Sequence, residues 1–159
     1  MKTLIVYYSY SGITEKVVSI YESCLRKTGD VTIQRLRPKE EITTFFGQCK
    51  AAFARKRAEL DGNVIFDVKN YDLVIIGSPV WAFAPVPAIN AYLDKICGLD
   101  GKKVIILLTS GSGTGVGNCF NTIKKSLEEK NAASIDTINI PNRTMNDESS
   151  IESALKKLL

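Results

Sequence analysis

Residues 9–14, Ser-Tyr-Ser-Gly-Ile-Thr, carry several hydroxyl groups and a glycine but no Lys or Arg. They follow an apolar segment and lead into an expected helix. The first amides of a helix lack intrahelical partners, and the helix dipole favours an anion beside them. Hydroxyl groups add donors, and Gly12 allows the backbone to approach a ligand closely. The pattern predicts a phosphate site built from neutral donors, although Ser11 or Thr14 could instead serve only as a helix cap.

A second segment, residues 77–89, reads GSPVWAFAPVPAI and contains the single Trp of the chain. Trp81 and Phe83 stand among prolines that restrict the backbone. Together they could form a rigid, flat wall for a flat aromatic ligand. The alternative is that both side chains only cover an edge of the core, because buried aromatic residues most often just pack.

A third segment, residues 109–118, reads TSGSGTGVGN and combines hydroxyl groups with four glycines. It lacks the dinucleotide pattern G-x-G-x-x-G because Val116 stands at the final glycine position, and it also lacks the ATP-binding pattern G-x-x-x-x-G-K-[ST]. Neither ATP nor a Rossmann-type dinucleotide is favoured. The alternative is a flexible connection without a ligand.

The residue types limit the available chemistry further. Histidine is absent, which excludes histidine-based triads, metal sites and proton shuttles. The four cysteines form no C-x-x-C pair, so we expect reduced thiols. Cys119 could be activated at the start of a helix, but we expect a small packed residue instead. Any chemistry would therefore come from other residues or from a cofactor.

Charge and hydropathy argue against nucleic-acid and membrane partners. The net charge of +4 is mild, and the Lys and Arg residues are spread along the chain. Nucleic-acid binding calls for a stronger basic stripe. No apolar run reaches the ~20 residues that span a bilayer, and we expect a cytoplasmic protein. An anionic NAD(P)H or an acidic partner could be attracted by a group of four arginines, although a solvated surface is the simpler interpretation. These are Arg35, Arg37, Arg55 and Arg57.

The hydrophobic pattern predicts five strands that alternate with five helices. The expected strands are 3–8, 31–36, 72–77, 103–109 and 134–140. The expected helices are 12–28, 40–60, 86–97, 116–130 and 147–159. Such alternation predicts an α/β fold in which helices cover both faces of a parallel sheet, here as one domain over residues 1–159. Ligands bind such sheets beyond the carboxyl ends of the strands, where the three segments described above would lie.

Taken together, these residues resemble the flavodoxin-like, FMN-binding family over essentially the whole chain. The phosphate motif [ST]-x-[ST]-G-x-T appears as residues 9–14, directly after the first expected strand. DLVIIGSPVW followed by P-x-P-A-I is similar to the second flavin loop of the oxidoreductase branch. The resemblance implies a three-layer sandwich with a five-stranded parallel sheet of order 2-1-3-4-5 and FMN as the cofactor.

The resemblance also implies which residues bind FMN. The phosphate would be held by Ser9, Tyr10, Ser11, Gly12, Ile13 and Thr14. The isoalloxazine would be lined by Pro79, Val80, Trp81, Ala82 and Phe83. The other side of the ring and the ribityl chain would meet Thr109, Ser110, Gly111, Gly113 and Gly117. No catalytic side chain and no metal ligand is expected.

Three features depart from typical carriers of this family: the net charge is positive, residues 109–118 contain no aromatic residue, and Ala82 follows Trp81 where a glycine-containing peptide is usual. We expect a flavodoxin-type electron carrier or an NAD(P)H-dependent, quinone-reductase-like FMN enzyme. The partner would be a redox protein or a small molecule of the NAD(P)H or quinone type. The alternative is a phosphate-binding or regulatory domain without flavin. The sequence leaves open the donor, the acceptor, one- or two-electron chemistry, and the oligomeric state.

Overall fold

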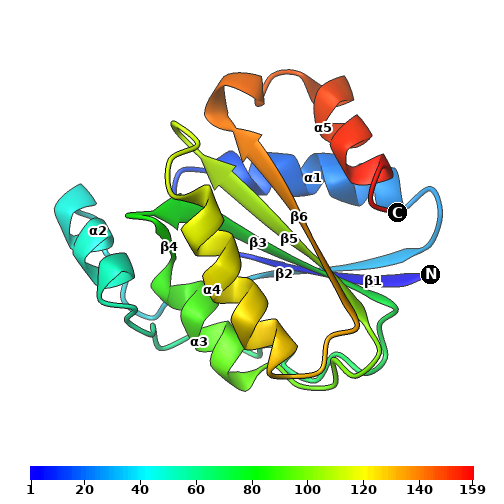
Figure 1. Cartoon of the computed structure of the whole chain (residues 1–159), viewed down its shortest axis with the longest axis horizontal. Coiled ribbons are helices and arrows are strands. Elements are labelled where there is room, and N and C mark those ends of the chain that lie inside the picture. Colours follow the sequence, from blue (N-terminus) through cyan, green and yellow to red (C-terminus); the bar gives the residue numbers. More distant parts are fainter.

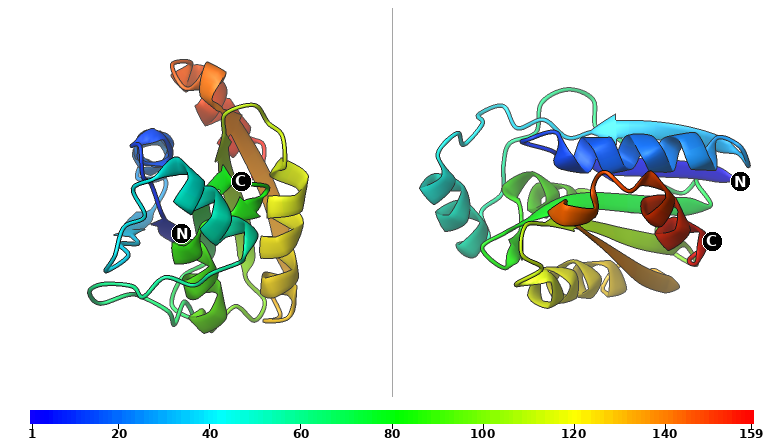
Figure 2. Two further views of the ribbon diagram at one scale, coloured as in Figure 1. Left: turned by 90° about the vertical axis from the view of Figure 1, so that its left-hand side faces the viewer. Right: turned by 90° about the horizontal axis from the view of Figure 1, so that it is seen from above.

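The computed structural model describes residues 1–159 and shows a parallel sheet between two layers of helices (Figures 1 and 2). Its parallel strands are β1 (Lys2–Tyr7), β2 (Asp30–Arg35), β3 (Leu73–Trp81), β5 (Lys103–Ser110) and β6 (Ser134–Pro141). They are ordered β2-β1-β3-β5-β6. Because β5 and β6 are the fourth and fifth parallel strands, the predicted order 2-1-3-4-5 is confirmed. The short strand β4 (Ala84–Pro85) pairs antiparallel with β3.

Helices cover both faces of the sheet, as the continuous apolar strands predict. They are α1 (Ile13–Leu25), α2 (Phe45–Phe53), α3 (Pro87–Lys95), α4 (Val116–Glu128) and α5 (Glu148–Lys156), with a short 3₁₀ turn η1 at Asn142–Thr144. Residues of α1 and α5 pack on one face, and residues of α3 and α4 pack on the other. Helix α2 lies outside this sandwich, beyond the edge of the sheet (Figure 1). No helix is both long enough and apolar enough to span a membrane.

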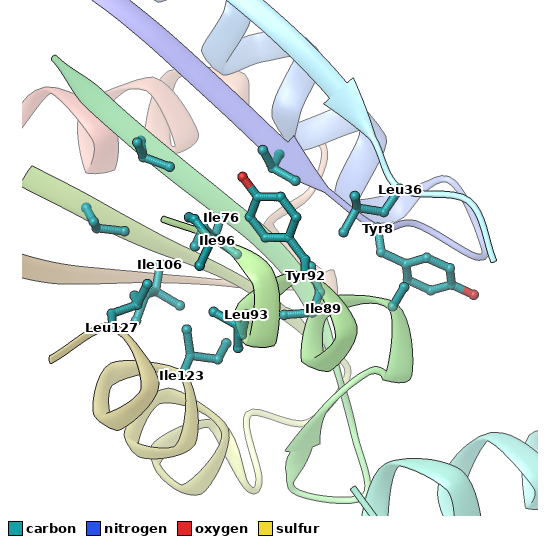
Figure 3. Close-up of a cluster of buried hydrophobic side chains, with 14 of the residues drawn as sticks. Tyr8, Leu36, Ile76, Ile89, Tyr92, Leu93, Ile96, Ile106, Ile123 and Leu127 are labelled. Carbon is teal, nitrogen blue, oxygen red and sulfur yellow. The ribbon is translucent and has the colours of Figure 1, made fainter. Parts of the chain in front are cut away.

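Each face of the sheet has its own hydrophobic core. Figure 3 shows the core under α3 and α4, where Ile89 and Tyr92 of α3 belong to one cluster with strand residues such as Ile76 and helix residues such as Ile123. The Tyr92 hydroxyl is satisfied because it donates to the carbonyl of Ile65 at 3.0 Å. Burial raises the pKa of Tyr92, so it remains a neutral donor. Both cores hold the strands rigidly and thereby fix the loops at their carboxyl ends.

Two sequence predictions about element bounds were wrong. The second helix spans only Phe45–Phe53 rather than 40–60. It begins after Thr44, whose Oγ1 accepts a hydrogen bond from the Gly47 amide, and it ends before Arg55, whose φ is 49°. Gly47 therefore lies inside the helix and does not break it.

The second error concerns the segment after residue 77. Strand β3 does not end there but continues to Trp81, and a two-residue turn at Ala82 and Phe83 leads back into β4. Both turn residues have positive φ, 44° and 67°. A turn of this kind normally carries Gly or Asn, and prolines such as Pro79 normally exclude a strand, so the local sequence gave no hairpin signal.

Gly77 allows β3 to pack closely against the loop that follows β1. A Cβ atom at this position would lie 2.8 Å from the Cβ of Tyr7 and 3.3 Å from Cγ2 of Thr14. We expect Gly77→Ala to lower the free energy of unfolding by about 1–3 kcal/mol, because the core there has no room to relax. Gly117→Ala is the matched control, since that helical glycine faces open space and alanine favours a helix by up to about 1 kcal/mol. Urea unfolding measures both variants, and equal midpoints would contradict the argument.

Candidate cofactor site

A cleft of about 550 Å³ opens at the carboxyl edge of the sheet, a size typical of small-molecule sites. Its lining contains no charged side chain. The lining residues are Tyr10, Ser11, Ile13, Thr14, Phe45, Gln48, Cys49, Pro79, Val80, Trp81, Ala82, Phe83, Thr109, Ser110, Gly111, Ser112, Thr114 and Asn142. The three segments singled out in the sequence therefore meet in one place.

The N-terminus of α1 forms one wall of the cleft, and no side chain caps it. Gly12 precedes the helix with φ 84°, a left-handed conformation that suits glycine. In contrast, Thr44 caps α2 and Asp147 caps α5 through side-chain hydrogen bonds. The interpretation that Ser11 or Thr14 merely caps α1 is thus wrong. Its first amides remain available to an anion, together with the positive end of the helix dipole.

Three buried hydroxyl groups near this helix end also fit a phosphate. The Oγ of Ser9 is buried and has no hydrogen-bond partner, a state that costs about 1–3 kcal/mol unless an acceptor is supplied. The hydroxyls of Thr14 and Thr109 lie 2.8 Å apart and are also buried. Since only one of these two hydroxyls donates to the other, one proton stays free for a ligand. The residues present therefore fit an anionic group.

Arg35 of β2 stabilises the predicted phosphate loop, residues 9–14, from behind. Its Nη2 donates to the carbonyl of Ser9 at 3.0 Å, and its Nη1 pairs with Glu15 at 2.9 Å. Tyr7 also donates to Glu15 at 3.3 Å. The guanidinium does not line the cleft. Sequence analysis treated Arg35 as a solvated charge and missed this role, because β2 and the loop meet only in the folded sheet.

Trp81 forms the aromatic wall, held by two tyrosines of the first loop. Its ring makes edge-to-face contacts with Tyr8, at 5.7 Å and 89°, and with Tyr10, at 6.2 Å and 80°. The Tyr8 hydroxyl in turn bonds to Glu41, and that of Tyr10 donates to the carbonyl of Thr43. Burial and the Glu41 contact raise the pKa of Tyr8, which keeps it protonated. Trp81 packs on the core and lines the cleft as well, and its contact with a flat ligand stays a prediction.

Phe83 joins the second loop to the third. Its side chain projects from the turn with positive φ and packs on the backbone of Gly115. A Cβ atom added to Gly115 would lie 2.3 Å from Cδ1 of Phe83. Gly115 precedes α4 with φ 81°, again without a side-chain cap. The third loop has no aromatic residue of its own, and the second loop supplies this one instead. Phe83 remains 51% exposed and available at the mouth of the cleft.

Most of the predicted site residues line the cleft. Ser9, Gly12, Gly113 and Gly117 do not. Ser9 and Gly12 belong to the predicted phosphate loop, whereas Gly117 lies on the exposed surface of α4. The ligand contacts predicted for all four residues stay predictions. Sequence analysis missed Phe45, Gln48, Cys49, Ser112, Thr114 and Asn142. The three on α2, Phe45, Gln48 and Cys49, belong to no ligand-binding motif. They line the cleft only because the fold places α2 over it. Cys119 is a packed residue as expected, and burial raises its pKa to about 12.

The sequence matches the family described as Flavodoxin over residues 2–155. The chain belongs to the flavodoxin family. Among curated proteins, a search found no match. Several solved structures share the fold of this flavodoxin-family protein.

A candidate flavoprotein from Bacteroides uniformis superposes with a TM-score of 0.75 at 20% identity, over 98% of this chain and 97% of that one. A flavoprotein in complex with FMN from Lactobacillus acidophilus gives 0.65 at 24% identity, over 93% and 98%. Oxidised flavodoxin 2 from Bacillus cereus gives 0.61 at 19% identity, over 100% of both chains. At these identities the likeness shows the fold alone.

The cysteines offer a test of ligand binding in this cleft. Cys49 is partly buried in its lining, whereas Cys97 is exposed and does not line it. We expect saturating FMN to slow the alkylation of Cys49 by about tenfold or more, because a bound ligand covers the thiol that the reagent must reach. Peptide mass mapping after iodoacetamide treatment measures both sites. Cys97 is the internal control, and equal labelling of Cys49 with and without FMN would place the ligand elsewhere.

The contact of Phe83 with Gly115 should control the shape of the cleft. We expect Gly115→Ala to displace Phe83 and weaken FMN binding by about tenfold or more, since overpacking costs about 1–3 kcal/mol. Gly101→Ala is the matched control, because Gly101 also has positive φ, 70°, but faces open space. Fluorescence titration with FMN compares the two variants. Equal affinities would show that the contact does not shape the site.

Proposed function

We propose that this flavodoxin-family protein binds FMN non-covalently in the cleft and acts as a flavin redox protein. The observation that carries it is the composition of the cleft, which combines the uncapped N-terminus of α1 and the Thr14–Thr109 hydroxyl pair with the braced indole of Trp81. The unpaired hydroxyl of Ser9 lies in the loop just before α1. A phosphate at the N-terminus of α1 and a flat ring beside Trp81 would match the two parts of FMN. Family membership and the FMN of the Lactobacillus acidophilus protein support this cofactor.

Bound FMN would supply the electron-transfer chemistry. The protein's own residues bind and orient it. Ser9 and the first amides of α1 would receive the phosphate, and Trp81 with the Ala82–Phe83 turn would position the ring and limit water around it. Arg35 keeps the phosphate loop in place through the Ser9 carbonyl. The four free cysteines are those of a reducing compartment, which supports a cytoplasmic location.

Within this function, a reductase acting on a flat, apolar acceptor of the quinone type is favoured over a carrier. The mouth of the cleft carries two exposed phenylalanines, Phe45 at 81% and Phe83 at 51%. Exposed aromatic side chains beside a cofactor suit a small apolar molecule that leaves water to bind. The positive net charge also differs from that of an acidic carrier that docks on basic partners.

A titration with FMN and with riboflavin tests the proposed cofactor. We expect FMN to quench the fluorescence of Trp81 and to bind more tightly than riboflavin, because only FMN carries the phosphate. Since no cationic side chain lines the cleft, the affinity should change less than about threefold between low and high salt. Ser9→Ala should reduce the preference for FMN, while Ser153→Ala on exposed α5 should not.

Other outcomes of this titration are equally informative. A protein that ignores both flavins would support the flavin-free alternative. A steep salt dependence would mean that a cationic side chain holds the phosphate.

Reduction of the FMN-loaded protein by NAD(P)H, followed by oxidation with a quinone, would distinguish a reductase from a carrier that requires a protein partner.

A further inference from the structure

A second cavity, of about 740 Å³, lies between α3, α4 and the segment that follows α2. We call it the α3–α4 groove. It shares two lining residues, Ala82 and Phe83, with the cofactor cleft. The strained turn is therefore a common wall between the two cavities. A ligand in the groove would lie next to whatever occupies the cleft.

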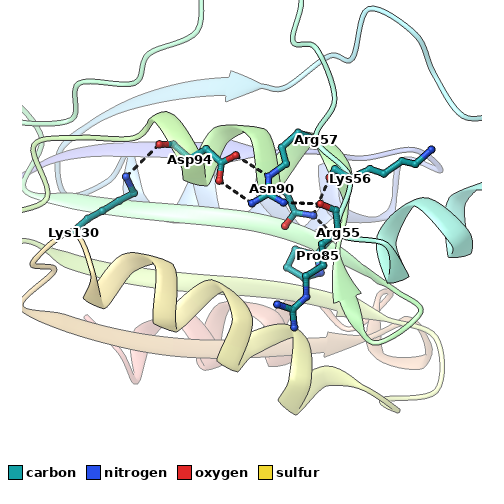
Figure 4. Close-up of polar contacts among 7 residues, drawn as sticks. All are labelled: Arg55, Lys56, Arg57, Pro85, Asn90, Asp94 and Lys130. Carbon is teal, nitrogen blue, oxygen red and sulfur yellow. Dashed lines mark hydrogen bonds and ion pairs between the residues drawn. The ribbon is translucent and has the colours of Figure 1, made fainter.

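The groove presents cations without partners. One cation of the groove, Arg57, is neutralised by Asp94. Its Nε and Nη2 donate to the Asp94 carboxylate at 2.7 and 3.1 Å, and this pairing lowers the pKa of Asp94. Arg55 and Lys125, in contrast, make no ion pair and donate no side-chain hydrogen bond to another residue. Figure 4 shows the Arg55 side chain extending from its backbone toward α4, away from the Arg57–Asp94 pair. Two free positive charges thus face one cavity.

The arginine is held in place by the backbone around it. Arg55 has positive φ, and the carbonyls of Arg55 and Lys56 accept hydrogen bonds from Arg57 at 2.7 Å and from Asn90 at 3.2 Å (Figure 4). Asn90 also donates to Pro85 of β4 at 3.4 Å. The segment carrying Arg55 is therefore fixed to α3 and β4 rather than free. Such fixing lowers the entropy lost when its guanidinium binds an anion.

Helix α4 supplies the opposite wall and neutral donors. Asn118 and Asn121 line the groove, and their side-chain amides bond to no other residue. Asn118 lies in the first turn of α4, whose N-terminus has no side-chain cap and favours negative charge. The one unpaired acid in the groove, Glu129, lies at the opposite end of α4. Lys125 lies four residues before Glu129 on the same helix without forming an ion pair with it, and the N-terminal part of α4 presents no acid to the groove.

We propose that the α3–α4 groove is a second ligand site, which binds a phosphate-bearing small molecule of nucleotide size between Arg55 and Lys125. Arg favours planar, bidentate contacts with phosphate oxygens, and asparagine amides add donors to them. The volume is within the range of small-molecule sites. Because the groove meets the cleft at Phe83, a molecule bound there would lie beside the flavin and could act as the second substrate of the flavin reaction. This role of the ligand rests on the proposed function.

Calorimetric titration of the FMN-saturated protein tests the site, with the FMN fully reduced beforehand under anaerobic conditions so that NADPH can bind without reacting. The probes are NADPH, inorganic pyrophosphate and citrate. We expect NADPH and pyrophosphate to bind and citrate to bind at least about tenfold more weakly, since the proposed site recognises phosphate. Arg55→Ala and Lys125→Ala should each weaken NADPH binding by about tenfold. Citrate as the best probe, or no binding by any probe, would overturn the proposal.

Lys124→Ala is the matched control. Lys124 precedes Lys125 on the same helix but pairs with Glu128 at 3.6 Å and does not line the groove. This variant changes the net charge equally and should keep NADPH binding within about twofold. An equal loss in both lysine variants would mean general charge attraction and overturn the site. The affinity for FMN, measured separately, should be the same in all variants. If FMN itself does not bind, the proposed function fails, but pyrophosphate titration of the same protein still decides the groove.

Discussion

Parallel pairing of β3 with β1 on one side and β5 on the other is the constraint on which both cavities depend. Parallel strands end at the same edge of a sheet, so the loops after them must meet there. The buried contact between Thr14 and Thr109 joins the start of α1 directly to the carboxyl end of β5. Gly77 permits this meeting because it leaves room for Tyr7 and Thr14. The site is therefore a consequence of strand order and of one close backbone approach.

Backbone strain is concentrated where the two cavities join. Ala82 and Phe83 both adopt positive φ, which costs a residue with a Cβ atom about 1–2 kcal/mol each. The packing of Phe83 on Gly115 holds the turn in this conformation. Strain of this kind persists only where surrounding contacts enforce it, and it commonly marks functional positions. In this protein the strained turn places Phe83 both at the mouth of the cleft and in the wall of the groove.

The two cavities differ in their electrostatics. The cleft offers amide dipoles and hydroxyl groups without a charged side chain, whereas the groove offers Arg55 and Lys125. Neutral donors fixed by the backbone suit a resident group, because they hold one phosphate in one geometry. Charged side chains suit a ligand that arrives and leaves, because they attract it over a longer range than neutral donors do. This contrast is consistent with a bound cofactor beside an exchanging substrate.

The α/β class, the order of the elements and the three ligand-facing segments followed from the sequence itself. Apolar periodicity and hydroxyl-rich turns are local properties, and residues 9–14 carry their own helix-start signal. The tertiary structure alone decided the β3–β4 turn, the position of α2 over the cleft, the role of Arg35, and the groove between α3 and α4. Each of these depends on contacts between residues far apart in the chain, such as Phe83 with Gly115. Local propensity does not encode such contacts, since the backbone conformation of Ala82 and Phe83 is imposed by the packing around them.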